Sequence, residues 1–191
     1  MRLPLIDPDK LTAEQRPFYD DMQAVIAKSF KGFKSFDDQG ALIGPFNPWL
    51  QEPQFGKPIW ELAKALATAP SLPPTVRELA ILVTGAKFHA AYEIYAHVAL
   101  AERRGLPDDK LATIVAGQRP SNLTEQEAIA YDLAAALLAG GVLPALNYRA
   151  SVKAFGAHGT AELIYLVSFY CLVCLTLNGY DERVPVEEET A

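Results

Sequence analysis

The feature of this sequence that most constrains its fold is the spacing of its apolar residues, which recur every three or four positions in almost every segment. Pro and Gly residues separate these segments, and the short alternating runs that would mark strands are missing. The sequence therefore predicts an all-α protein, a multi-helix bundle. Helices are expected over about residues 12–30, 60–67, 74–85, 88–104, 107–117, 124–140, 147–155 and 160–178.

The chain of 191 residues is half apolar, which is enough for one substantial core. Residues 1–70 are expected to form an N-terminal helix and a loop that pack on a helical core of residues 71–180, and residues 181–191 are expected to be a disordered tail. The loop, residues 31–58, is rich in Pro, Gly and aromatic residues. It is interpreted either as a lid or wall of a pocket, or as a surface segment whose aromatic rings fill gaps in the core.

The charge and the apolar runs disfavour several classes of protein. A net charge of −6 disfavours a broad nucleic-acid surface or an anionic membrane patch, because both require clustered Lys and Arg. The N-terminus has no apolar stretch of signal-peptide length, so a cytoplasmic location is expected. The longest apolar run, residues 163–177, is shorter than the roughly 20 residues of a membrane span and predicts a core or subunit-interface helix.

The stretch HAAYEIYAHVALA places His89, Glu93 and His97 at intervals of four residues among apolar neighbours. A step of four residues turns an α-helix by only about 40°, so the three side chains form a stripe in which neighbours can touch. A half-buried carboxylate and imidazole in contact have coupled titrations and can move protons near neutral pH.

Other interpretations of these residues compete with proton transfer. A Glu and a His four residues apart are also a common surface pair, and Glu78 could be the third residue of a capping box that begins at Thr75. His89 is expected in a first helical turn, where an exposed or capping role is common. Three ligands on one straight helix cannot converge on a single metal ion, so no metal is expected.

Cys171 and Cys174 form a C-x-x-C pair, which is also the spacing of thioredoxin-like redox sites. They lie in the apolar run LIYLVSFYCLVCLTL, where burial raises the pKa of a thiol. We expect two inert core cysteines, remote from His97.

The segment RELAILVTGAKFHAAYEIYAHVALAERRGLP resembles the carboxymuconolactone decarboxylase family, which includes the alkylhydroperoxidase AhpD. The resemblance rests on RELAIL, on the Y-E-x-x-x-H-V core and on the Gly-Leu that ends the helix; TEQEAIAYDLAAALL, ELIYLVSFYCLVCLTLNGY and GPFNPWLQEP extend it over most of residues 40–180. It implies an AhpD-like helical fold that assembles into homotrimers or homohexamers.

AhpD-type members carry a Glu, a C-x-x-C beginning twelve residues later and a His four residues after the second Cys. On this chain the Glu is Glu78 and the His is His97, but the cysteine positions are Ala90 and Glu93. A thiol peroxidase needs a thiolate and a resolving thiol, and both are missing there. What remains, Glu78, Glu93 and His97, is similar to the decarboxylase version of the site.

The resemblance implies cofactor-independent decarboxylation or proton transfer on a small cyclic or unsaturated carboxylic acid. His97 is expected to donate the proton, Glu93 to hold its tautomer and Glu78 to join the hydrogen-bond network. Alternatives are an AhpD-like peroxidase using Cys171 and Cys174, or a non-catalytic ligand-binding or assembly protein. The residues expected to bind the substrate are Arg77, Lys87, His89, Tyr92, Phe46 and Trp49.

Overall fold

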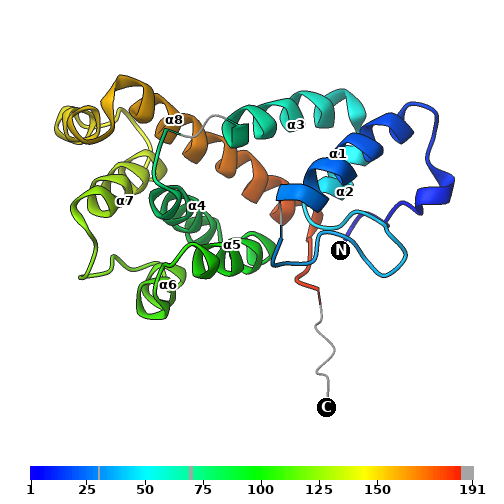
Figure 1. Cartoon of the computed structure of the whole chain (residues 1–191), viewed down its shortest axis with the longest axis horizontal. Coiled ribbons are helices and arrows are strands. Elements are labelled where there is room, and N and C mark those ends of the chain that lie inside the picture. Colours follow the sequence, from blue (N-terminus) through cyan, green and yellow to red (C-terminus); the bar gives the residue numbers. More distant parts are fainter. Residues whose placement is uncertain (30, 69–70, 186–191) are drawn as a thin grey trace, which may run out of the picture.

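The computed structural model describes residues 1–29, 31–68 and 71–185. These residues form eight α-helices and no strand, so the predicted all-α class is confirmed. A 3₁₀ turn, Pro8–Lys10, precedes the first helix (Figure 1). The helices are α1 Gln15–Ser29, α2 Phe46–Gln51, α3 Pro53–Thr68, α4 Pro74–Phe88, α5 Ala91–Arg103, α6 Asp108–Val115, α7 Glu125–Leu138 and α8 Ala145–Tyr180.

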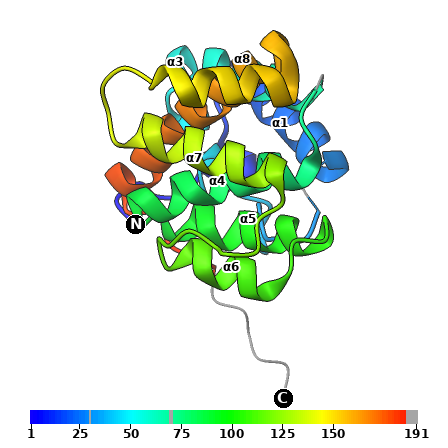
Figure 2. The same ribbon diagram turned by 90° about the vertical axis from the view of Figure 1, so that its left-hand side faces the viewer.

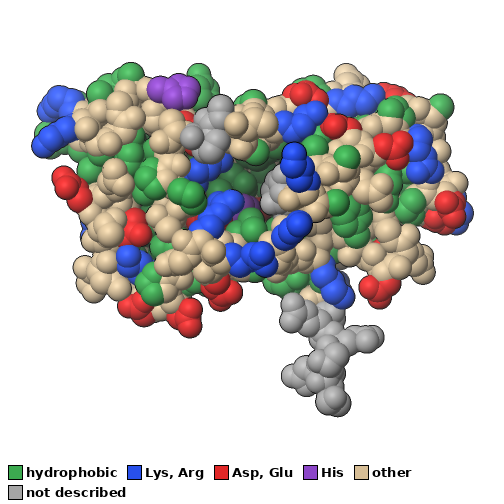
Figure 3. All heavy atoms as spheres, viewed as in Figure 1, with side chains coloured by type: hydrophobic (Ala, Val, Ile, Leu, Met, Phe, Trp, Pro, Cys, Tyr) green, Lys and Arg blue, Asp and Glu red, His purple; other side chains and the backbone are tan. Residues whose placement is uncertain are grey.

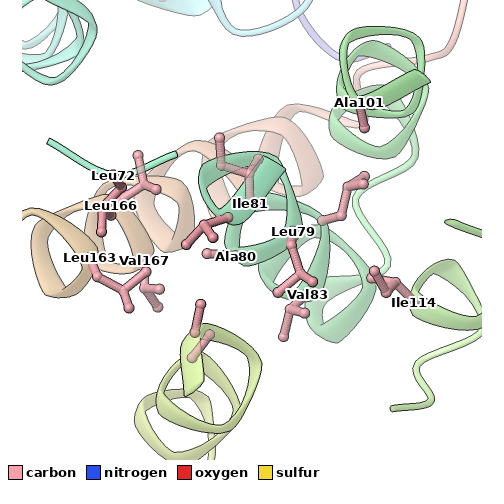
Figure 4. Close-up of a cluster of buried hydrophobic side chains, with 14 of the residues drawn as sticks. Leu72, Leu79, Ala80, Ile81, Val83, Ala101, Ile114, Leu163, Leu166 and Val167 are labelled. Atoms are coloured by element: carbon pink, nitrogen blue, oxygen red, sulfur yellow. The ribbon is translucent and has the colours of Figure 1, made fainter. Parts of the chain in front are cut away.

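The helix α4 is the centre of the larger hydrophobic core. In Figure 2 it crosses the molecule between α8 on one side and α5 and α6 on the other. Ten consecutive or near-consecutive residues of α4 are buried, which is the pattern of a helix covered on all sides. Figure 4 shows Ala80 on the side of α4 that faces Val167 of α8, and both belong to this core.

A second hydrophobic core joins α1, α2 and α3 to the C-terminal half of α8. Three aromatic side chains form its centre, with Phe46 and Trp49 from α2 packed edge-on or tilted against Trp60 of α3. Phe169 of α8 contacts the same group from the other side. The helix α8 therefore contributes to both cores, and the two groups of helices lie along it (Figure 1).

The helix α8 is bent at Gly156, whose φ of 71° lies outside the helical region. The expected pair of helices over 147–155 and 160–178 is thus present as two segments joined at this residue. By length and composition α8 is the one helix among the described residues that could cross a membrane. Half of its most apolar window is buried inside the molecule, as in a core helix, so this is weak evidence for a membrane span.

Two predicted capping boxes are confirmed and one is not. Thr12 with Gln15 and Thr124 with Glu127 form reciprocal capping hydrogen bonds. The helix α4 begins at Pro74 as expected but has no side-chain cap, so Glu78 is free of the capping role considered for it.

Several predicted boundaries were wrong. The loop expected over residues 31–58 contains α2 and the start of α3, because Pro53 lies in a first helical turn, where a missing N–H costs nothing. The helix expected to stop near Gly85 continues to Phe88, and His89, with a φ of 51°, ends it. The next helix therefore begins at Ala91, and His89 does not share it with Glu93 and His97.

The proposed division into parts at residue 70 stays a prediction. Residues 186–191 of the expected disordered tail lie outside the described residues. Its first residues are packed on the fold, because Asp181 caps α8 and Glu182 is buried.

Two glycines allow the segment around α2 to pack closely. Gly44 has a φ of 63°, and a Cβ there would lie 2.2 Å from the ring of Tyr92. Gly56 of α3 lies against α2, where a Cβ would lie 2.0 Å from the backbone oxygen of Trp49. Both contacts hold the aromatic residues of α2 in place.

We predict that Gly56→Ala destabilises the protein by about 1 to 3 kcal/mol, the usual cost of overpacking, because the new methyl meets backbone rather than a movable side chain. Gly179→Ala is the matched control, since Gly179 lies in α8 with nothing near its missing Cβ. It should be neutral or stabilising, as Ala favours helix more than Gly does by roughly 1 kcal/mol. Urea unfolding measures both, and equal stability of the two variants would contradict the prediction.

Candidate functional site

A cavity of about 270 Å³ lies where α2, α3, α4, α5 and α8 meet. Figure 3 shows a hollow on this face of the molecule, with hydrophobic side chains inside it and Lys and Arg side chains around its rim. Most of its wall is aromatic or aliphatic, which suits a small flat ligand. The aromatic residues of the wall are Phe33, Phe46, Trp49, Trp60, Tyr92, Phe169 and Tyr170.

Three ionisable residues form a buried chain on one side of this cavity. Glu78 of α4 is 1% exposed, and Glu93 and His97 of α5 are 3% and 6% exposed. Nδ1 of His97 lies 2.7 Å from Oε2 of Glu78, and Nε2 of His97 lies 3.1 Å from Oε1 of Glu93. The imidazole thus lies between two carboxyl groups, all three of which belong to the cavity wall.

The orienting hydrogen bond of His97 comes from Glu78, not from Glu93 as the sequence predicted. An ionised carboxylate can only accept, so Nδ1 of His97 donates to Glu78 and Nε2 is left facing Glu93. The close approach of Nε2 and Oε1 of Glu93 lacks hydrogen-bond geometry, and Oε1 has no other partner in the described residues. Glu78 therefore fixes the ring, and Glu93 is the less constrained acid.

Burial perturbs the titration of the pair. It raises the pKa of the Glu93 carboxyl to about 7, an effect that His97 opposes and Glu78 adds to. Burial lowers the pKa of His97, but the carboxylates of Glu78 and Glu93 outweigh it, so the pKa lies above its ordinary value. A proton near Nε2 of His97 and Glu93 is thus exchangeable close to neutral pH.

Arg104 is a site residue that the sequence analysis missed. Its Nη1 donates to Oε1 of Glu78, and its side chain, which also lines the cavity, is 37% exposed. In the sequence it follows Arg103 in the last turn of a helix, where basic residues are usually solvated. Only the packing of α4 against α5 places its guanidinium next to the Glu78 carboxylate.

Tyr170 of α8 was missed for a different reason. Its ring lies edge-on to the imidazole of His97, with the centroids 5.1 Å apart, and burial raises the pKa of its hydroxyl well above the ordinary value. In the sequence it is one apolar-looking residue in a long apolar run.

The residues predicted to bind substrate separate into two groups. Tyr92, Phe46, Trp49 and Arg77 line the cavity. Lys87 and His89 do not, and both are exposed. The reason is the turn at residues 89–90, which ends α4 and directs its last residues away from the helix α5 that carries His97.

Neither cysteine lines the cavity. Burial raises the pKa of both thiols, and in Cys174 the charge of Glu93 raises it further. Cys174 is therefore inside the electrostatic range of Glu93 and not remote from the site as expected. Within the described part of the chain, no group of three or more His, Cys, Asp or Glu side chains is arranged to hold a metal ion.

Comparisons with known proteins agree on the fold. The model of the carboxymuconolactone decarboxylase family matches residues 53–136. The debrominase Bmp8, solved as a cysteine-to-alanine variant with 2,3,4-tribromopyrrole, is 13% identical with a TM-score of 0.71, over 97% of this chain and 91% of that one. No curated protein sequence matches the chain.

A second solved structure with this fold is a protein of unknown function from Agrobacterium tumefaciens, named as a candidate AhpD antioxidant defence protein. It is 14% identical with a TM-score of 0.66, over 75% of this chain and 99% of that one. The family match over residues 53–136 and the shared AhpD-like fold together support the resemblance of this chain to the carboxymuconolactone decarboxylase family.

Proposed function

We propose that this protein is a cofactor-independent enzyme that decarboxylates, or transfers a proton to carbon on, a small cyclic or unsaturated carboxylic acid. The observation that carries the proposal is the chain Glu78, His97, Glu93 on the wall of a largely apolar cavity. The family match over residues 53–136 supports it, and the tribromopyrrole held by the debrominase is a small ring in the same fold.

The proposed decarboxylation requires groups that stabilise a developing negative charge and a donor that protonates carbon. The bond between the ring and its carboxylate breaks, carbon dioxide leaves, and the electron pair passes into the conjugated system as a dienolate. His97, kept positively polarised by Glu78, stabilises the developing negative charge. A proton from the His97 and Glu93 pair then neutralises the carbon, and solvent restores that proton.

The assignment of the proton donor differs from the one expected from the sequence. His97 remains a donor, but Glu93 is the group whose proton is lost near neutral pH and whose Oε1 has no hydrogen-bond partner in the described residues. Glu78 does the orienting. We assign the transferred proton to the Glu93 carboxyl, relayed through or shared with Nε2 of His97.

A thiol peroxidase is the weaker interpretation. The two positions that carry cysteines in AhpD-type members are Ala90 and Glu93 here. The thiols that do exist, Cys171 and Cys174, lie outside the cavity wall and have raised pKa values, whereas a peroxidatic cysteine needs a lowered one.

We predict that His97→Asn and Glu93→Gln each lower turnover by roughly 10²- to 10⁴-fold, the usual range for acid–base groups. Furan-, pyrrole- and lactone-carboxylic acids are screened for release of carbon dioxide and for uptake of solvent deuterium at carbon. The double variant should lose little more than either single variant, because the pair acts as one unit. Additive losses would mean that the two side chains act separately.

The cysteines provide the control for this chemistry. The Cys171→Ala, Cys174→Ala variant should keep its turnover, although removing buried sulfur lowers stability. Loss of activity in this variant while His97→Asn stays active would favour the peroxidase over the proposed enzyme.

We predict that Glu93→Gln becomes more stable relative to the natural protein as the pH rises. The pKa of Glu93 is about 7 in the folded protein against an ordinary 4.5, so between these values only the folded state keeps the proton. The stability of the natural protein therefore falls as the pH rises through this window, by about 1 to 3 kcal/mol. The variant lacks this loss.

The control is Glu102→Gln, which removes an exposed carboxyl from the same helix. Urea unfolding at pH 5 and pH 8 measures all three proteins. A stability difference between Glu93→Gln and the natural protein that is the same at both pH values would show that Glu93 ionises as an ordinary carboxyl.

We also propose that the chain forms a homotrimer or homohexamer through α8. Tyr165, Leu172 and Leu175 are exposed on this helix and lie on one side of it. Leu175→Glu should dissociate the assembly, and Val142→Glu, at an exposed residue of the turn before α8, should not. Sedimentation at micromolar concentration tests this, and a 20.8 kDa monomer of the natural chain would contradict the proposal.

A further inference from the structure

The two arginines of the cavity wall differ in how many of their N–H groups already have protein partners. Arg77 is 12% exposed, and it donates to Glu162 through Nη1 and to the backbone oxygen of Leu66 through Nη2. Glu162, which is not part of the cavity wall, also accepts hydrogen bonds from Ser71 and from the backbone of Leu72. Arg77 is therefore a neutralised residue that ties α8 to the start of α4.

Arg104 retains free hydrogen-bonding capacity. In the described structure its guanidinium makes one hydrogen bond, from Nη1 to Glu78, and its other N–H groups have no protein partner. It lines the cavity and is 37% exposed, so it lies where the cavity meets solvent. A guanidinium in this position can bind a planar oxyanion through two parallel hydrogen bonds.

The charge balance of the wall also favours an anion. Arg77 is balanced by Glu162, and Arg104 is balanced by Glu78. His97 and Glu93 share the remaining proton, so the wall carries no net negative charge when one proton is bound and a net positive charge when two are bound. A ligand with one negative charge is the complement of the second state.

We propose that the cavity binds a planar ring carrying a single anionic oxygen group, and that Arg104 is the residue that receives this group. The inference rests on the proposed function and adds a specificity-determining residue to it. Arg104 and His97 bind opposite oxygens of Glu78, so an anionic group bound by Arg104 fixes one end of the ligand at a short distance from the imidazole. The ring extends from it along Trp49 and Tyr170 to the imidazole.

Binding of the anion should be linked to proton uptake. The titratable and charged groups facing the Glu93 and His97 pair are Glu78 of α4, Tyr92 of α5, Arg104 directly after α5, and Tyr170 and Cys174 of α8. Of these, the two tyrosines and the thiol stay neutral because burial raises their pKa values. An added negative charge therefore favours a second proton on the pair, and anion affinity should fall as the pH rises above about 7.

The test uses benzoate as the anionic probe and benzamide as its neutral counterpart of the same shape, and it requires no turnover. Calorimetry at pH 7 should show that the natural protein prefers benzoate. Arg104→Gln should weaken benzoate binding by about 10- to 100-fold, as expected for charge-assisted hydrogen bonds, and leave benzamide unchanged. Arg104→Lys should give an intermediate loss, because the charge stays and the paired donors do not.

The matched control is Arg103→Gln, which removes the same charge from the neighbouring, exposed position that does not line the cavity. It should change benzoate affinity less than twofold. Heats measured at pH 8 in two buffers of different ionisation enthalpy should show uptake of up to one proton per benzoate, and less in Glu93→Gln.

Equal binding of benzoate and benzamide, equal losses in the Arg103 and Arg104 variants, or no benzoate binding at millimolar concentration would each overturn the inference. These results are independent of the proposed chemistry, which is judged by the turnover of His97→Asn. Circular dichroism confirms that each variant is folded, and Arg104→Lys serves if Arg104→Gln is not.

Discussion

The buried carboxylate of Glu78 is the interaction on which the rest of the site depends. Removing an ionised carboxylate from water costs several kcal/mol unless partners replace the lost solvent. Here Arg104 holds one oxygen and His97 the other. Because Glu78 belongs to α4, His97 belongs to α5 and Arg104 directly follows α5, these bonds also fix how the two helices are rotated against each other. The hydrogen bond from Nδ1 to Glu78 directs Nε2 of His97 to Glu93, and the packing of the two helices brings all four side chains to the cavity wall.

The close packing of α4 and α5 begins at the turn that joins them. Gly85 faces the Glu93 and Ile94 side chains, and even a Cβ there would make only ordinary contact with them, at 3.4 to 3.5 Å. The left-handed conformation of His89 then reverses the chain within two residues. A longer connection would let α5 slide along α4 and separate Glu78 from His97. His89 thus shapes the site through its backbone, while its side chain stays exposed.

What the sequence could predict was the part fixed by local chemistry. Helical spacing gave the class, and the caps at Thr12 and Thr124 gave two helix starts within a few residues. The stripe of Glu93 and His97 was legible because both lie on one helix. The sequence could not predict Arg104 and Tyr170 as site residues, because their roles arise from contacts with Glu78 and His97 that join different elements. The prediction that Lys87 binds substrate was wrong for the converse reason. Lys87 is close to the site in sequence, but the turn at His89 separates it from the site in space.

The position of Glu93 explains how this fold can support different chemistry with few changes. In AhpD-type members the sequence pattern puts a cysteine at this position, beside the same histidine. A thiol in contact with an imidazole is driven towards thiolate and becomes a nucleophile. A carboxyl in the same buried place is driven the other way, because desolvation opposes its charge more strongly than the histidine favours it. The scaffold of Glu78 and His97 can thus stay unchanged while the group opposite it changes from a nucleophile to an acid.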